Sequence, residues 1–334
     1  MREQLRLSIP SKGRLSEDTI EFFHACGFHI HKANPRQYEA TIAEFPGLGV
    51  LFQRPSDIVI SLLDGSIDFG ITGLDLFAEH DAIGNGLILL HDALGYGHCS
   101  LCLAIPEAQT EVTTVRDLID FQNTLRRPLK IATKYPHLTA LFFNQLGIDY
   151  SIVSAEGTLE LAPAIGYADI ISDLVSSGQT LKDNRLKKVG DGCILASQAV
   201  LAGNKHVLQT NPAALSVAKQ LLEFFEAYQR AENNMAIFVN IRGENQSEIA
   251  EKIFSKTTIG GLNGPTISNI VRRDEEDNWH ALHIIVHKDE LFKAITELRA
   301  IGGSGVIVTP VTYIFEEEPP RVKALVDILN MEKP

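Results

Sequence analysis

The sequence predicts an α/β protein whose larger part forms two lobes and whose C-terminal part forms a separate small domain. From Leu5 to Arg230, short apolar runs alternate with amphipathic stretches, a pattern typical of a mainly parallel sheet covered by helices. From Asn234 onward the predicted order is strand, helix, two strands, helix and strand, which is typical of ferredoxin-like or ACT-like domains. A chain of 334 residues is long enough for two or three such domains.

Each lobe is predicted from its own series of strands and helices. Lobe I begins with strand Leu5–Ile9, a Ser-Lys-Gly loop, helix Leu15–Cys26, helix Ser56–Leu63 and strand Ile67–Thr72. Lobe II follows with strand Leu129–Thr133, helix Leu138–Leu146, strand Tyr150–Val153, helix Thr158–Ile165 and strand Asp169–Ser172. The strand-like residues Cys193–Leu201 are expected to return to lobe I, and a long helix, Pro212–Arg230, leads out of it. We therefore expect residues 1–94 and 186–230 in lobe I, residues 95–185 in lobe II, and a ligand cleft at the carboxyl ends of the strands.

The C-terminal domain, residues 231–334, is predicted to be a βαββαβ unit. Its elements are strand Asn234–Arg242, helix Ser247–Ser255, strands Thr266–Arg272 and Trp279–Val286, helix Lys288–Ala300 and strand Gly305–Val311. The charged run Arg272–Asp277 indicates a solvated hairpin turn between the two middle strands.

Composition excludes several classes of protein. Hydrophobic residues make up 45% of the chain, which is enough for a packed core. The formal net charge of −12 argues against nonspecific binding to nucleic acid or to an anionic membrane. No apolar run reaches the roughly 18–20 residues that a membrane span requires. The N-terminus lacks the apolar core of a signal peptide, so we expect a cytoplasmic protein.

The four cysteines do not indicate a disulfide framework in a chain of this length. Cys99 and Cys102 form a CxxC next to His98, but there is no second CxxC. Because the flanking residues are typical of a strand, we favour a structural strand over a metal or redox site here. His24, His29, His31 and His91 are not in metal-ligand spacing.

The segment from Asp169 to Leu181 gives the strongest indication of a ligand. It combines a buried strand, two aspartates and a Ser-Ser-Gly loop before the polar, helix-forming run Gln179–Lys188. A helix N-terminus presents N–H groups without intrahelical partners, and Gly178 can take the positive φ that lets the backbone approach a phosphate. Asp169 and Asp173 beside this loop can hold ribose hydroxyls or a Mg²⁺ that accompanies a polyphosphate. An ordinary strand–turn–helix corner has a similar composition, so the loop alone leaves both interpretations open.

Further segments resemble the ATP phosphoribosyltransferase family in the same order along the chain. They are Ile9–Leu15, Val50–Asp57, Asp64–Asp75, the segment Asp169–Leu181, Ile194–Val200 and Gly261–Thr266. The likeness covers nearly the whole chain and points to the long form of the family, which has a C-terminal regulatory domain. It implies a two-lobed catalytic core like that of periplasmic binding proteins. It also implies transfer of phosphoribosyl from phosphoribosyl diphosphate (PRPP) to N1 of ATP, with release of diphosphate. This is the first, histidine-inhibited step of histidine biosynthesis.

The resemblance, together with residue type, assigns roles to individual side chains. PRPP binding is expected at Asp169, Asp173, Leu174, Val175, Ser176, Ser177, Gly178, Gln179 and Thr180. ATP and diphosphate binding is expected at Lys12, Gly13, Arg14, Arg54, Gly73, Asp75, Glu156 and Glu160. The guanidinium of Arg54 can bind two phosphate oxygens at once. Lys12 and Arg54 could equally be solvated surface residues, and Asp75 and Glu160 could be helix caps.

We expect no covalent nucleophile and no dedicated metal cage. Diphosphate is already a good leaving group once Mg²⁺ neutralises it, so positioning and electrostatics can supply most of the acceleration. Because the sequence shows no dedicated metal cage, Mg²⁺ should arrive with the substrate.

The resemblance also predicts regulation and assembly. A pocket for inhibitory L-histidine is implied at Leu262, Thr266, Ile285 and Gly305, and the family suggests dimers assembled into a hexamer. Two other classes remain open, namely a two-lobed small-molecule-binding protein and an inactive regulatory homologue. Release of diphosphate from PRPP only when ATP is present would distinguish the enzyme from both.

Overall fold

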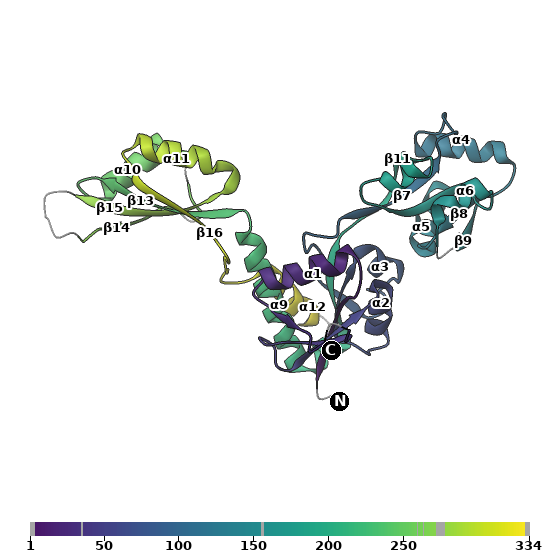
Figure 1. Ribbon diagram of the computed structural model, residues 1–334, viewed down its shortest axis with the longest axis horizontal. Coiled ribbons are helices and arrows are strands. Elements are labelled where there is room, and N and C mark those ends of the chain that lie inside the picture. The colour runs from purple at the N-terminus through teal and green to yellow at the C-terminus, as the bar shows by residue number, and fades with distance from the viewer. Residues whose placement is uncertain are drawn as a thin grey trace. The chain divides into compact units, whose positions relative to one another are not determined.

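The computed structural model describes residues 4–34, 36–154, 157–258, 260–262, 264–271 and 278–330. The chain divides into two compact units. Unit 1 contains the residues up to Lys219 and the end of the chain from Leu325, and unit 2 contains Gln220–Ala324. Both units consist of sheets covered by helices (Figure 1), so the predicted α/β class is confirmed. Within the described residues, no helix is both long enough and apolar enough to cross a membrane.

Lobe I of unit 1 is built on a seven-stranded sheet with the order β2-β3-β4-β1-β5-β12-β6. The neighbours β4, β1 and β5 are parallel, whereas β12 runs antiparallel to β5 and β6. The carboxyl ends of β4, β1 and β5 therefore lie at one edge of this sheet. The strands are β1 (Leu5–Pro10), β2 (Ile30–His31), β3 (Glu39–Ile42), β4 (Leu48–Gln53), β5 (Phe69–Gly73), β6 (Leu87–His91) and β12 (Ala199–Asn204).

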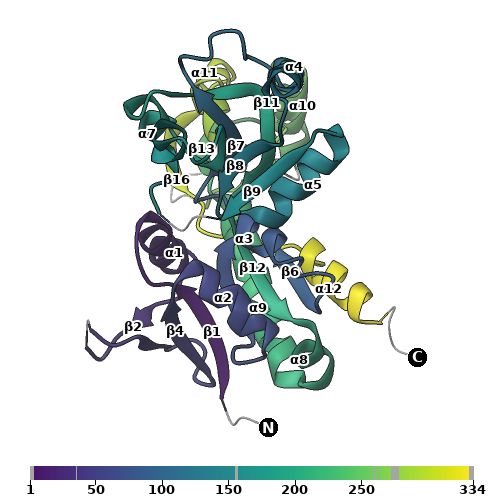
Figure 2. The ribbon, with the colours of Figure 1, turned by 90° about the vertical axis from the view of Figure 1, so that its right-hand side faces the viewer.

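Helices cover this sheet with apolar faces. In α2, Ile58 and Leu62 are fully buried, and the helix packs on β5 and β1. Figure 2 shows α2 beside β1. Pro55 starts α2 at a position where a missing N–H costs nothing. The helices of lobe I are α1 (Arg14–Ala25), α2 (Pro55–Leu63), α3 (Leu74–Glu79), α8 (Lys205–Thr210) and the start of α9 (Pro212–Ala231).

Lobe II is built on a five-stranded sheet with the order β11-β7-β10-β8-β9. Strands β10, β8 and β9 are parallel, and β7 runs antiparallel to β10 and β11. The strands are β7 (Cys99–Pro106), β8 (Leu129–Thr133), β9 (Tyr150–Ser154), β10 (Ile170–Val175) and β11 (Leu186–Ser197). The helices are α4 (Val115–Leu125), α5 (Pro136–Leu146), α6 (Ala162–Ile165) and α7 (Gln179–Asp183), with a 3₁₀ turn at Leu159–Leu161. Fully buried Leu103, Ile131, Phe143 and Ile170 form the centre of one core cluster.

Two sequence predictions about lobe II are wrong. The helical run Gln179–Lys188 stops at Asp183, because Arg185 takes a positive φ of 57° and Leu186 starts β11. Strand β11 pairs with β7, so residues 186–197 belong to lobe II and not to lobe I. The chain returns to lobe I at Gln198, immediately before β12.

Both connections between the lobes lie at the carboxyl edges of the two sheets. The first runs from the end of β6 to Cys99, which begins β7 beside the end of β10. The second runs from Ser197 to Ala199, which pairs with Gly73 at the end of β5. This arrangement brings the carboxyl edges of both sheets to the region where the chain crosses.

Unit 2 contains a four-stranded antiparallel sheet with the order β14-β15-β13-β16. Its strands are β13 (Asn234–Arg242), β14 (Thr266–Asn269), β15 (Trp279–His287) and β16 (Ser304–Pro310). Helices α10 (Gln246–Lys256) and α11 (Leu291–Ala300) lie on one face of the sheet (Figure 1). The core between sheet and helices includes Ile237, Ile249, Ile253 and Leu298, all fully buried. The predicted βαββαβ order is thus confirmed, whereas the charged turn Arg272–Asp277 lies outside the described residues.

The final helix, α12 (Pro320–Asn330), was not predicted from the sequence. Before it, Tyr313 and Phe315 contact the ring of Phe224. The guanidinium of Arg321 pairs with the buried carboxylate of Glu226 at 2.9 Å. These contacts attach the end of the chain to the part of α9 that belongs to unit 2.

Candidate functional site

The loop after β10 has the geometry expected of an anion-binding loop. Gly178 takes a φ of 78°, which a side chain would strain, and it directly precedes α7. The hydroxyl of Ser177 accepts a hydrogen bond from the Gln179 amide at 3.3 Å, and Ser176 and Ser177 are exposed. Thr180 is also exposed. The side-chain amide of Gln179 donates to the carboxylate of Asp183 at 2.7 Å. The loop therefore presents two serine hydroxyls and a glycine backbone to solvent.

Two predicted PRPP residues of β10 serve mainly to pack the sheet. Val175 is buried in a core cluster of lobe II, and Leu174 packs beside Leu101 and Tyr135. At Val175 the backbone is what can meet a ligand, whereas the side chain of Leu174 is half-buried.

Asp173 is the acidic residue closest in sequence to the loop, and it lies within β10. Its side chain is half-buried, and the Leu174 amide donates to Oδ1 at 2.8 Å. Burial raises the pKa of Asp173, and the charge of Glu160 acts in the same direction, although Leu174 and Lys134 oppose it. A carboxylate that has lost solvent in this way gains most from hydroxyl donors on a ligand.

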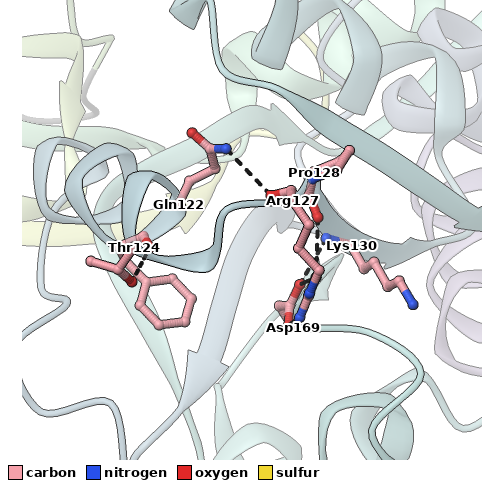
Figure 3. Close-up of polar contacts among 7 residues, drawn as sticks. Gln122, Thr124, Arg127, Pro128, Lys130 and Asp169 are labelled. Carbon is pink, nitrogen blue, oxygen red and sulfur yellow. Dashed lines mark hydrogen bonds and ion pairs between the residues drawn. The ribbon is translucent and has the colours of Figure 1, made fainter.

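Asp169, also predicted to bind PRPP, lies at the other end of β10 from this loop. It precedes the first residue of β10, whereas the loop follows the last, which separates them by roughly 20 Å of extended chain. Both guanidinium nitrogens of Arg127 donate to its carboxylate at 2.7 Å, and the Lys130 amide donates at 2.9 Å (Figure 3). Burial raises the pKa of Asp169, but the hydrogen bonds from Arg127 and Lys130 outweigh burial and lower it. Asp169 thus joins β10 to β8 and to the segment before it.

The predicted cations of lobe I lie together at the carboxyl edge of the first sheet. Lys12 and Gly13 follow β1, and Arg54 follows the adjacent parallel strand β4. The Ser11 amide donates to the Gln53 carbonyl at 2.8 Å, which continues the pairing up to these residues. Lys12, Arg14 and Arg54 are exposed, and Arg14 lies 3.6 Å from the carboxylate of Asp18. These side chains are available to a polyanion.

Asp75 is buried, and it connects the two lobes. It lies in the first turn of α3 with 3% of its surface exposed. The Tyr135 hydroxyl donates to Oδ2 at 2.8 Å, and the Ser197 hydroxyl donates to Oδ1 at 2.6 Å. A Cβ placed on Gly73 would overlap the Asp75 carboxylate, so a side chain here would force that carboxylate to move. Burial and the charge of Asp75 together raise the pKa of Tyr135.

A second carboxylate of α3 also reaches lobe II. The amides of His137 and Leu138 donate to Glu79 at 2.8 and 2.9 Å. These two amides open helix α5, whose own N-cap, Tyr135, makes no capping bond through its side chain. Glu79, Tyr135 and Ser197 were not among the residues predicted for the site. Tyr135 and Ser197 lie at the ends of β8 and β11, at the same edge as the predicted residues, so strand ends were the usable signal.

The remaining site predictions have different outcomes. Glu156 lies outside the described residues, and Glu160 lies in the 3₁₀ turn close enough to Asp173 to affect its pKa. Groups of three or more His, Cys, Asp or Glu that could hold a metal ion are absent from the described part of the chain.

In unit 2 the four residues predicted for L-histidine do not meet within one chain. Leu262 and Ile285 line a pocket of about 240 Å³, together with polar Thr258, His287, Glu290 and Lys293. Thr266 lies on edge strand β14 and Gly305 on the opposite edge strand β16, with two strands between them. Within one chain, Thr266 and Gly305 therefore lie at opposite edges of the sheet.

Comparison with known proteins gives consistent matches. The family model of ATP phosphoribosyltransferase matches residues 54–226, and that of the HisG C-terminal domain matches residues 231–313. ATP phosphoribosyltransferase 2, chloroplastic, of Arabidopsis thaliana is 42% identical, over 99% of this chain and 82% of the relative. The ATP phosphoribosyltransferase of Halorubrum lacusprofundi is 31% identical, over 92% of this chain and 98% of its own.

One solved structure shares the fold. It is the ATP phosphoribosyl transferase (HisG:HisZ) complex from Thermotoga maritima, with a TM-score of 0.52 and 24% identity. The match covers 67% of this chain and 99% of that chain. At this identity the likeness concerns the fold alone.

Proposed function

The chain belongs to the ATP phosphoribosyltransferase family, and we propose that PRPP binds at the loop after β10 and ATP at the facing edge of lobe I. The enzyme transfers phosphoribosyl from PRPP to N1 of ATP, the first step of histidine biosynthesis. The observation that carries the site assignment is the buried Asp75, which hydrogen-bonds Tyr135 and Ser197 of lobe II. The contacts of Asp75 join the two lobes at these edges. The edge of lobe I carries Lys12 and Arg54, and the edge of lobe II carries the loop after β10.

In this proposal the loop holds the 5′-phosphate and Asp173 holds the ribose diol. The φ of 78° at Gly178 and the exposed hydroxyls of Ser176 and Ser177 suit a phosphate, since hydroxyls and backbone N–H groups donate to its oxygens. The half-buried carboxylate of Asp173 suits two neighbouring hydroxyl donors.

Lys12, Arg14 and Arg54 would bind the triphosphate and the departing diphosphate. The whole chain carries a formal charge of −12, so a polyanion must be held by local cations against the overall field. The three side chains are exposed at one edge of the sheet, and an arginine fork can bind two oxygens of one phosphate.

The reaction needs no covalent intermediate. N1 of adenine forms a bond to C1′ as the bond from C1′ to the diphosphate oxygen breaks, and that electron pair leaves with diphosphate. The site residues hold both substrates in line and neutralise developing charge, which are contributions of positioning and electrostatics.

We propose that Mg²⁺ enters as part of the PRPP complex and neutralises its diphosphate. Mg²⁺ prefers oxygen ligands and keeps several waters, so one or two carboxylates suffice on the protein side. Glu160, whose charge raises the pKa of nearby Asp173, is one such carboxylate.

Control by L-histidine is proposed for unit 2. The pocket lined by Leu262 and Ile285 offers apolar cover, while Lys293 and Glu290 match the two charges of a free amino acid. Inhibition from a separate unit requires stronger binding to a less active state. Leu262→Arg should weaken inhibition by histidine while leaving uninhibited turnover unchanged, and unchanged inhibition would place the effector elsewhere.

A homo-oligomer and a cytoplasmic location also belong to the proposal. The first is tested by light scattering with and without histidine. The second is tested by cell fractionation, because Arabidopsis relatives are described as chloroplastic.

The deciding experiment is diphosphate release from PRPP. We expect release only when ATP is present, with intersecting initial-velocity lines because both substrates bind before a product leaves. A solute-binding protein or an inactive homologue would release none, and parallel lines would indicate a covalent intermediate.

A further inference from the structure

The CxxC spacing of Cys99 and Cys102 does not form a dithiol pair in this fold. Both residues lie on strand β7, where residues three apart point to opposite faces. Their Cα atoms are then about 10 Å apart at the ordinary rise of a strand, whereas a disulfide needs less than about 7 Å.

A different cysteine, Cys193, lies directly opposite Cys102. The two are register partners in the antiparallel pair of β7 and β11. Opposed residues in such a pair have Cα atoms about 4.5–5.5 Å apart, which falls within the range that disulfides occupy.

The two thiols differ in access to solvent. Cys102 is buried, with 5% of its surface exposed, and Cys193 is exposed. Burial, followed by the neighbouring Cys193, raises the pKa of Cys102 to about 11, although the charge of Lys188 opposes this. An oxidant from solvent therefore reaches Cys193 first, and Cys102 stays a thiol until a partner sulfur is presented to it.

The backbone around Cys193 is irregular in a way that permits bond formation. The register between β11 and β7 shifts on both sides of the Cys193–Cys102 pair. Such bulges leave residues out of the regular ladder, so the strand can move locally without breaking a continuous series of hydrogen bonds.

We propose that Cys102 and Cys193 form a reversible redox pair that reacts with small-molecule disulfides such as oxidised glutathione. The Cys193 thiolate attacks the oxidant RSSR, giving a mixed disulfide and releasing RSH. The Cys102 thiol then loses its proton and attacks the Cys193 sulfur, which displaces the second RSH and closes a cross-strand disulfide. The protein loses two electrons and two protons, and the oxidant is reduced to two thiols.

The pair is placed to affect the PRPP site. On its other side, Cys102 is the register partner of Asp173 in the β7–β10 pair. Asp173, Cys102 and Cys193 thus form one row across three strands, with their side chains on the same face. Closing the disulfide draws Cys102 toward β11 and should shift Asp173. This coupling rests on the proposed role of Asp173, whereas the disulfide itself does not.

The thiol chemistry is tested on the full-length protein. After reduction and exposure to excess oxidised glutathione, two of the four thiols should disappear, and non-reducing peptide mapping should show a Cys102–Cys193 link that dithiothreitol reverses. The Cys99→Ser variant should behave like the parent, and the Cys193→Ser variant should form no intramolecular link. A Cys99–Cys102 link, or a glutathione adduct that stays on Cys193, would overturn the proposal.

The coupling is tested by activity. The oxidised parent should show a several-fold lower kcat/KM for PRPP, restored by dithiothreitol, and Cys193→Ser should be insensitive. A confirmed disulfide with unchanged kcat/KM would overturn the coupling. If the fully reduced parent releases no diphosphate from PRPP and ATP, the proposed function fails. The peptide mapping still shows whether Cys102 and Cys193 form a disulfide, because it does not depend on activity.

Discussion

Asp169 and Asp173 offer a matched test, because the same substitution at the two ends of one strand should have opposite effects. Asp173→Asn removes the carboxylate proposed to accept the ribose hydroxyls, and its position in β10 is otherwise compatible with an amide of equal size. A hydrogen bond to a charged group contributes about 1.5–3 kcal/mol, which corresponds to a loss of about 10- to 150-fold in kcat/KM for PRPP. Its thermal stability should change little, since burial and the charge of Glu160 oppose the charge of Asp173, whereas Leu174 and Lys134 favour it.

Asp169→Asn should do the reverse. It breaks the two-pronged contact with Arg127 and weakens the bond from the Lys130 amide, so the melting temperature should fall by several degrees. Its kcat/KM should stay close to that of the parent, because the residue lies at the far end of β10 from the loop.

The assay follows diphosphate release at varied PRPP and fixed ATP, with thermal unfolding by circular dichroism as the parallel readout. Loss of turnover in Asp169→Asn without loss of stability would refute the placement of the site. Normal kcat/KM in Asp173→Asn would refute the assignment of the ribose diol.

Further perturbations probe the neighbouring residues. Gly178→Val should reduce kcat/KM for PRPP more than Asp173→Asn does, since it strains a φ of 78° and fills the approach to the phosphate; parent-like kinetics would remove the loop from the site. Tyr135→Phe should destabilise unit 1 by about 1.5–3 kcal/mol in a denaturant titration, because the buried carboxylate of Asp75 loses a donor. If the losses of stability in Tyr135→Phe and Asp75→Asn simply add in the double variant, the two residues do not interact. The lowered pKa of Asp169 contributes stability above the ordinary pKa of an aspartate, and this contribution is lost as pH falls through the lowered value. The difference in melting temperature between parent and Asp169→Asn should therefore be full at pH 7 and vanish in strong acid. A difference that persists in strong acid would show that packing, and not the charge of Asp169, causes it.

The parts of the fold that depend on local patterning were predictable from the sequence. Strands Leu129–Thr133 and Asn234–Arg242 have the predicted bounds, because apolar alternation and turn residues mark their ends. Strand β10 was predicted to end at Ser172, whereas it continues to Val175 through Asp173, so the sequence alone did not separate the two aspartates.

The errors concern contacts that join distant residues. Arg127 and Asp169 are 42 positions apart, and Tyr135 and Asp75 are 60 apart. No local pattern encodes such pairs. The assignment of residues 186–197 to lobe II likewise depends on pairing with β7, which is interrupted by shifts in register that hide the alternation. Residues at strand ends were identified as a group, but their individual partners required the fold.

The contact of Glu79 with the start of α5 makes one helix depend on the other lobe for its first turn. The amides of His137 and Leu138 have their acceptors on α3, so any separation of the lobes exposes two N–H groups to water. Deuterium uptake at these two amides would therefore follow how often the lobes part, even though both groups belong to an otherwise ordinary helix. Substrates that hold the lobes together should slow this uptake, while amides in the middle of α5 exchange at an unchanged rate.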